Sequence, residues 1–197
     1  MKKPLLSLIL TFTLLLSACS SGSSGLFKDD IVDFISNEYR IYDTVSSVTD
    51  SENFSEIYIA EDRELDEVAS TISSHEQPEE MSERKDGKQV LVYDNLFVIL
   101  TVDEEDSSNT FIEVANEQFV RNNYSPDFFD GLLAYWLLSN LLGNDWGNTQ
   151  KQKCQRNPDN CYGGYGPSGG TFKGSNQTPT IRNGGSSVRG GGPGAGK

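Results

Sequence analysis

The most conspicuous candidate for chemistry in the sequence is RGGGPGAGK, residues 189–197. Gly191, Gly196 and Lys197 have most of the spacing of a phosphate-binding loop, in which backbone N–H groups and a lysine hold nucleotide phosphates. Such a loop follows a strand, starts a helix and carries a Ser or Thr after the lysine to hold Mg²⁺. No strand pattern precedes this stretch, and no Ser or Thr follows Lys197. We therefore expect an exposed tail that binds no nucleotide.

A second candidate is GPSGG, residues 166–170, which has the G-x-S-x-G pattern of a hydrolase nucleophile. That serine needs a strand-to-helix turn and a histidine base. This stretch is glycine-rich, and the only histidine, His75, lies in the polar stretch 75–88. We expect His75 to be a surface residue and predict no catalytic residue. A single histidine also excludes the common His-rich zinc sites.

The acidic cluster DEED, residues 103–106, could attract calcium, but it lacks the ligand and glycine spacing of a calcium-binding loop. No pair of carboxylates stands out as an acid–base couple. We expect a solvated turn here, no metal site and no other cofactor.

Cys154 and Cys161 enclose a short loop that contains a turn sequence at residues 157–159. In an exported chain a local disulfide is the natural interpretation, and two free thiols are the alternative. Two cysteines are too few for a structural zinc site.

The N-terminus has the order of a secretory signal peptide, with Lys2 and Lys3 before the largely apolar run 5–16. The run is short for a membrane span. The sequence LSAC, residues 16–19, resembles the lipobox of bacterial lipoproteins. This resemblance implies that Cys19 is lipidated and becomes the new N-terminus after cleavage of the signal peptide, which we assign to residues 1–19 with the lipobox cysteine; an ordinary signal peptide is the alternative. Residues 20–25 then form a flexible tether.

Charge divides the remaining chain into two parts. Residues 20–146 carry 28 acidic and 7 basic residues, a net charge of −21, whereas residues 147–197 carry 1 acidic and 7 basic residues, a net charge of +6. Fourteen of the 19 glycines lie after position 146. We predict an acidic domain over residues 26–146 and a basic, mostly disordered Gly-rich tail over residues 147–197.

Apolar periodicity in the acidic part alternates between helical and strand patterns. It predicts helices over residues 31–39, 65–72 and 117–122, and strands over residues 40–48, 57–60, 90–93, 96–102 and 110–114. The strand 96–102 is apolar on both faces and is expected at the centre of the sheet. The fold class is therefore α+β, with a small, mainly antiparallel sheet of about 4–5 strands and 3–4 helices.

The last predicted helix, residues 126–142, has Ser125 as a candidate N-cap and Gly143 just past its end. Apolar residues surround it on every side, so it is either a core helix or a helix that contacts the bilayer or a membrane-protein partner. For the second interpretation we expect at least one of four residues to be exposed and to contact the partner. These are Phe128, Tyr135, Trp136 and Leu142.

Four stretches together resemble one family: the lipobox, FIEVANEQFVRNNYSPDFF, the Leu-rich segment that ends in LLGNDW, and SVRGGGPGAGK. As a set they are similar to small lipoproteins of Bacillus-like Gram-positive bacteria that share domain of unknown function 4247. The resemblance implies attachment to the outer leaflet of the plasma membrane and suggests that the Gly-rich end is a family feature. It implies no activity, cofactor or catalytic residue.

The sequence therefore favours a non-enzymatic binding or scaffold lipoprotein on the extracytoplasmic face of the cell membrane. We expect it to bind the membrane through lipid on Cys19, a membrane-protein partner, and an anionic wall polymer or lipid through the tail, but no nucleic acid. The alternatives are a receptor for a cation or small ligand, favoured by the acidic charge, and an envelope hydrolase, for which no nucleophile–base pair is found.

Overall fold

The computed structural model describes residues 30–50 and 53–166 of the 197-residue chain. Six strands in this part form one sheet with the order β1-β2-β6-β5-β4-β3, and every neighbouring pair is antiparallel. The strands are β1 (Arg40–Ser46), β2 (Phe54–Ala60), β3 (Glu80–Met81), β4 (Lys88–Tyr93), β5 (Leu96–Val102) and β6 (Thr110–Asn116). The predicted α+β class and antiparallel sheet are confirmed, and the sheet has one strand more than the expected maximum of five.

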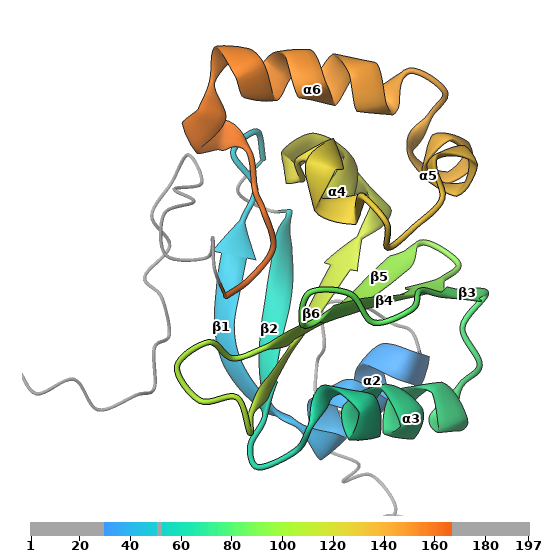
Figure 1. The fold of residues 1–197 in the computed structure, drawn as a ribbon, viewed down its shortest axis with the longest axis vertical. Helices are drawn as coiled ribbons and strands as arrows, with labels where there is room; N and C mark the ends of the chain where they lie inside the picture. The colour runs from blue at the N-terminus through green and yellow to red at the C-terminus, as the bar shows by residue number, and fades with distance from the viewer. Residues whose placement is uncertain (1–29, 51–52, 167–197) are drawn as a thin grey trace, which may run out of the picture.

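Helices cover both faces of the sheet, so the molecule has three layers (Figure 1). The helices α2 and α3 pack on one face, and α4, α5 and α6 lie over the other. The α-helices of the described part are α2 (Asp30–Glu38), α3 (Leu65–His75), α4 (Glu117–Asn123), α5 (Tyr135–Leu142) and α6 (Trp146–Arg156), with short 3-10 helices η2 (Pro126–Phe129) and η3 (Pro158–Asn160). These are five α-helices, where the sequence predicted three to four.

The sheet separates two hydrophobic cores. Successive side chains of a strand point to opposite faces, so a strand in the middle of the sheet contributes to both. On β5, Phe97 and Ile99 belong to the core under α4, α5 and α6, whereas Val98 and Leu100 belong to the core under α2 and α3. All four are fully buried. Burial on both faces explains why this strand is a continuous apolar run. The strand lies between β6 and β4, in the interior of the sheet as expected.

The other regular elements follow the predicted periodicities closely. Leu65, Val68 and Ile72 form the buried stripe of α3, and the hairpin between β4 and β5 turns at Asp94, whose φ is +35°. The unpredicted strand β3 has two exposed side chains, and its pairing with β4 depends on the backbone alone. No side-chain period indicates a strand of this kind.

The predicted single helix over residues 126–142 is wrong. The chain forms η2, leaves helical geometry at Asp130, and re-enters it only at α5 after the extended Ala134. Gly131 has φ +75°, a conformation that favours glycine, and Lys85 packs over it while its Nζ donates to the Asp130 carbonyl over 2.9 Å. The break lets Phe129 and Leu138 enter the same core from two directions.

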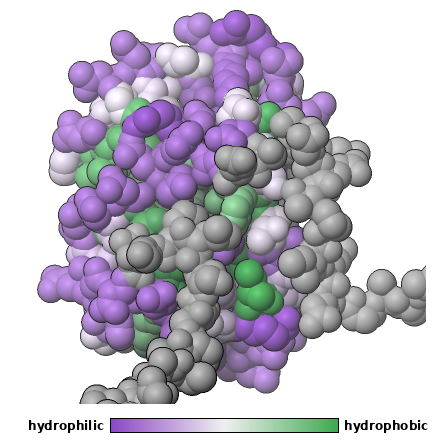
Figure 2. All heavy atoms as spheres, turned by 180° about the vertical axis from the view of Figure 1, so that it is seen from behind, coloured by the Kyte–Doolittle hydropathy of each residue, from purple (hydrophilic) through white to green (hydrophobic). Residues whose placement is uncertain are grey.

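The predicted domain boundary at residue 146 is also too early. Trp146 and Gln150 of α6 are buried, and Tyr162 beyond it is fully buried in the core under α4, α5 and α6. The folded part therefore continues through Gly166, the last described residue. The face seen in Figure 2 is mostly hydrophilic, with hydrophobic residues gathered in small patches.

Candidate functional site

A glutamate lies in the middle of the sheet. Glu113 is on β6 and faces α4, α5 and α6, because Phe111 and Ala115, two residues away on either side, belong to that core. Its pairing partners in the neighbouring strands are Ile57 and Ile99, both fully buried. Glu113 itself is 1% exposed. A buried carboxylate costs much free energy unless it is paired or takes up a proton.

The carboxyl group of Glu113 is held by the segment 161–166, which we call the C-terminal strap. The Tyr162 hydroxyl donates to Glu113 Oε2 over 3.0 Å, and the Tyr165 backbone N–H donates to the same oxygen over 3.2 Å. Tyr124 and Ser55 also face the carboxyl group. Glu113 Oε1, Tyr124 OH and Ser55 Oγ are nevertheless buried without a hydrogen bond of good geometry. Within residues 30–50 and 53–166, no basic side chain forms an ion pair with Glu113.

Burial dominates the ionisation of this group. It raises the pKa of the Glu113 carboxyl from its ordinary 4.5 to about 7, although the surrounding donors of Tyr124, Ser55, Tyr162 and Tyr165 lower it. Burial, followed by the charge of Glu113, raises the pKa of the Tyr124 and Tyr162 hydroxyls well above the ordinary value. Both tyrosines therefore stay protonated at neutral pH, whereas Glu113 can gain or lose a proton there.

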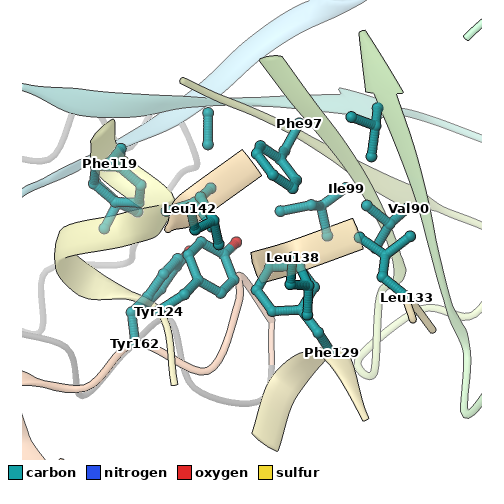
Figure 3. Packing of buried hydrophobic residues seen from close by; sticks show 14 of the residues in the cluster. Val90, Phe97, Ile99, Phe119, Tyr124, Phe129, Leu133, Leu138, Leu142 and Tyr162 are labelled. Carbon is teal, nitrogen blue, oxygen red and sulfur yellow. The ribbon is translucent and has the colours of Figure 1, made fainter. Parts of the chain in front are cut away.

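Backbone pairing and a disulfide fix the beginning of the strap. The Tyr162 N–H donates to the Asn123 carbonyl, and the Ser125 N–H donates to the Tyr162 carbonyl, both over 2.8 Å. Tyr124 and Tyr162 thus form a short parallel bridge, and their rings lie side by side in the core (Figure 3), with centroids 4.9 Å apart. One residue earlier, Cys161 is joined to Cys154 of α6, as predicted, with Cα atoms 5.4 Å apart.

The end of the strap reaches the edge strand β1. The Tyr165 hydroxyl donates to Asp43 Oδ2 over 2.9 Å, and its ring packs edge-on against Phe111 with centroids 5.0 Å apart. Gly164, with φ +87°, passes so close to the Phe128 ring that a Cβ would collide with it. The strap therefore crosses the sheet from α4 to β1 and covers Glu113.

The four residues expected to contact a partner divide into two pairs. Tyr135 and Trp136 are 59% and 63% exposed at the start of α5, which confirms the expected exposure of at least one of the four. Leu142 is buried, and Phe128 is only partly exposed because Gly164 and Lys88 pack against its ring. Only the first pair is available to a partner.

The remaining motifs of the described part lie away from this region. His75 stacks on Phe34 of α2 with ring centroids 4.0 Å apart, and its side chain is 35% exposed, as expected for a surface residue. Residues 103–106 form part of the loop between β5 and β6 and are mainly exposed. Among the described residues, no group of three or more His, Cys, Asp or Glu side chains could hold a metal ion.

Several predictions concern residues outside the described part. They concern the signal sequence with Cys19, the tether 20–25, most of GPSGG at 166–170, and the glycine-rich end with Gly191, Gly196 and Lys197. No helix of the described part is both long and apolar enough to cross a membrane.

Sequence reasoning missed Glu113 as a site residue. The signal was a single charged residue inside the predicted strand 110–114, at an alternate position shared with Phe111 and Ala115. A polar residue in a strand is ordinarily expected at the sheet surface, and the apolar neighbours alone are enough to predict the strand. The residues that cover Glu113, Tyr162 and Tyr165, fall within the predicted tail.

Searches among curated proteins and among solved structures gave no match. A family model, described as "Domain of unknown function (DUF4247)", matches residues 12–193. The match includes the whole three-layer domain and extends beyond it on both sides, into the apolar N-terminal run and the glycine-rich end. The chain therefore belongs to the family of proteins that contain domain of unknown function 4247.

Proposed function

We propose that this protein is a lipid-anchored, non-enzymatic binding protein at the outer face of the plasma membrane, and that Tyr135 and Trp136 contact its partner. The observation that carries the proposal is the exposure of these two adjacent rings, 59% and 63%. Tyrosine and tryptophan are enriched in interfaces and in binding hot spots. The same short helix buries Leu138 and Leu142, so the rings are presented on a fixed support.

The lipid anchor is supported by the lipobox sequence at residues 16–19 and by family membership that reaches back to residue 12. Eleven residue steps separate Cys19 from Asp30, the start of α2, and they span at most about 40 Å when fully extended. The domain would thus stay close to the bilayer. Because α2 and α5 lie on opposite sides of the sheet (Figure 1), the helix that carries the exposed rings is on the side opposite to the attachment. This arrangement suits an extracytoplasmic part of a membrane protein as partner.

The non-enzymatic part of the proposal is supported by the surroundings of the two groups best suited to proton transfer. His75 stacks on Phe34 in the α2–α3 layer, and its acidic neighbour Asp30 is 3.9 Å away. Glu113 lies in the opposite core and is closed off by the strap.

The basic C-terminal part would add a contact with an anionic wall polymer or lipid headgroup. Lys153 is unsuited to such a contact, because it is half-buried, burial lowers the pKa of its amine, and its Nζ donates to the Asn122 carbonyl over 2.6 Å. Lys151 is exposed and forms only a loose pair with Asp127 at 3.7 Å. A polymer contact would therefore use Lys151, the exposed Arg156 and the basic residues after 166.

Photo-crosslinking in intact cells tests the binding surface. A Trp136→Ser variant should lose the crosslinked partner while its free energy of unfolding changes by less than about 0.5 kcal/mol, because an exposed side chain contributes little to the core. Met81→Ser is the matched control, since Met81 is 47% exposed on β3. Equal crosslinking by wild type and Trp136→Ser would overturn the proposed surface.

Cell fractionation tests the anchor. Replacing Cys19 with Ala should move the protein from the membrane fraction to the soluble fraction, because two acyl chains give stable membrane attachment and their loss removes it. Mass spectrometry of the wild-type N-terminal peptide should show the acyl groups. Unchanged membrane association of the variant, together with an unmodified wild-type Cys19, would exclude the lipid anchor.

A further inference from the structure

The buried carboxyl group of Glu113 differs from that of an ordinary buried ion pair, because no basic side chain of the described residues pairs with it. Its two pairing neighbours, Ile57 and Ile99, are fully buried, and in the described residues its hydrogen bonds come from the strap, through Tyr162 and Tyr165. Such a carboxyl group can be neutralised inside the closed domain only by a proton or by a bound cation.

The unsatisfied atoms around Glu113 fit the protonated form. Glu113 Oε1, Tyr124 OH and Ser55 Oγ are all buried and lack a hydrogen bond of good geometry. A protonated carboxyl group gains a donor, whereas a hydroxyl oxygen can accept. Neutral Glu113 can therefore offer its proton to the hydroxyl of Tyr124 or Ser55 and keep Oε2 as the acceptor for the strap.

We propose that Glu113 is a proton-binding site that couples closure of the C-terminal strap to the acidity of the medium. With Glu113 neutral, residues 161–166 are closed over the sheet. With Glu113 charged, the buried anion favours the open strap, in which water can solvate the carboxylate.

The groups that face Glu113 do not change the direction of this pH dependence, in which the closed strap is favoured at low pH. They are Tyr124 at the end of α4, Ser55 of β2, and Tyr162 and Tyr165 of the strap; Asp43 of β1 lies behind Tyr165. Tyr124 and Tyr162 stay neutral near pH 7, because burial raises the pKa of both hydroxyls well above the ordinary value. A charged Asp43 opposes the negative form of Glu113 rather than stabilising it.

The expected pH window follows from the difference between the closed and open states. Burial raises the pKa of Glu113 to about 7 in the closed state, and an ordinary value of 4.5 applies once water reaches it. The closed state therefore binds the proton more tightly. Its advantage is complete below about pH 4.5 and is lost as the pH rises to 7, with the opening equilibrium increasing about tenfold per pH unit.

Hydrogen exchange of the full chain, purified in detergent, measures this opening directly. The amides to follow are those of Tyr162, Tyr165 and Ser125, which are all bonded across the strap contact. After correction for the intrinsic exchange rate, their protection should fall about 40-fold from pH 5 to pH 7 and then level off. Amides of α3 should show no such fall. Equal behaviour of the strap and α3 amides would contradict the proposal.

Glu113→Gln should abolish the pH dependence, because the amide imitates the neutral acid and cannot titrate. The matched control is Glu56→Gln: Glu56 is also buried and also accepts from a tyrosine hydroxyl, that of Tyr58, but it lies on the opposite face of the sheet. The control should keep the wild-type slope. A slope that persists in Glu113→Gln, or disappears in Glu56→Gln, would overturn the assignment to Glu113.

Two further measurements keep the test decisive if Glu113→Gln does not fold. Tyr162→Phe should lower strap protection at every pH and retain the slope, because the carboxyl group is still present; loss of the slope would count against the proposal. Replacing sodium by potassium or choline at constant ionic strength should change nothing. A cation-dependent slope would show that Glu113 binds a metal cation rather than a proton.

Discussion

Asn123 connects two distant parts of the chain, the loop after β1 and the helix α4, through one buried side chain. Its Oδ1 accepts from the Ser47 hydroxyl over 3.1 Å and from the Val48 N–H over 3.0 Å, while its Nδ2 donates to the Phe119 carbonyl over 2.8 Å. Asn123 is fully buried. The loop after β1 is thus fixed to the end of α4, next to the residues that cover Glu113.

Replacing Asn123 with Ala should lower the free energy of unfolding by about 2–3 kcal/mol, because buried donors and acceptors lose their partner. Chemical denaturation measures the change. The control is Asn122→Ala, because Asn122 contacts α6 through its backbone carbonyl, which the substitution keeps. That change should cost less than about 0.5 kcal/mol. Similar losses for both variants would show that the Asn123 hydrogen bonds contribute little.

The sequence could not indicate which polar residues become buried. Glu113 and Tyr162 are 49 residues apart, and their hydrogen bond depends on how the whole helical layer folds back over the sheet. A local pattern contains no information about such a pair. The disulfide was predictable because the two cysteines are only 7 residues apart in the sequence.

At the scale of elements, apolar periodicity was sufficient to predict those helices and strands that bury a regular set of apolar side chains. It predicted α2, α3, α4 and five of the strands close to their observed bounds. It failed over residues 126–142, because an apolar run indicates burial and does not specify the backbone geometry. There, Asp130 and Gly131 interrupt the helix, and two short segments pack separately.

The short helix α5 gives a test of this packing. Leu138 is 5% exposed within the core, so Leu138→Ala should lower the free energy of unfolding by about 2–5 kcal/mol. Asn140→Ala, on the exposed side of the same helix, should change it by less than about 0.5 kcal/mol. Thermal and denaturant unfolding give both values. A loss for Leu138→Ala no larger than that for Asn140→Ala would mean that α5 does not depend on core packing.

At the scale of the whole molecule, charge composition misplaced the end of the domain. The change from acidic to basic composition occurs near residue 146, whereas in the described part the buried core extends to Tyr162. The two boundaries differ because α6 is a polar helix: besides Trp146 and Gln150, its residues are mostly exposed. Composition indicates which residues face water. A helix that covers a core can be polar along most of its length and bury only a few residues.

Truncation should locate the true boundary. A chain that ends at Gly166 keeps the described core contacts and should unfold in one cooperative transition at about the same temperature as the full chain. A chain that ends at Asp145 lacks Trp146 and Tyr162, exposes the core around Tyr124, and should lose the cooperative transition. Circular dichroism during heating distinguishes the two. Cooperative unfolding of the shorter chain would restore the boundary predicted from composition.

The pairing of Tyr124 with Tyr162 also affects when the domain can be completed. A chain exported with its N-terminus first delivers all six strands before the strap, because β6 ends at Asn116 and the strap begins 45 residues later. Until the strap arrives, the core over Glu113 lacks its cover. If the protein is exported as proposed, an unfinished domain would therefore emerge first, and the last step of its folding would coincide with the meeting of Cys154 and Cys161.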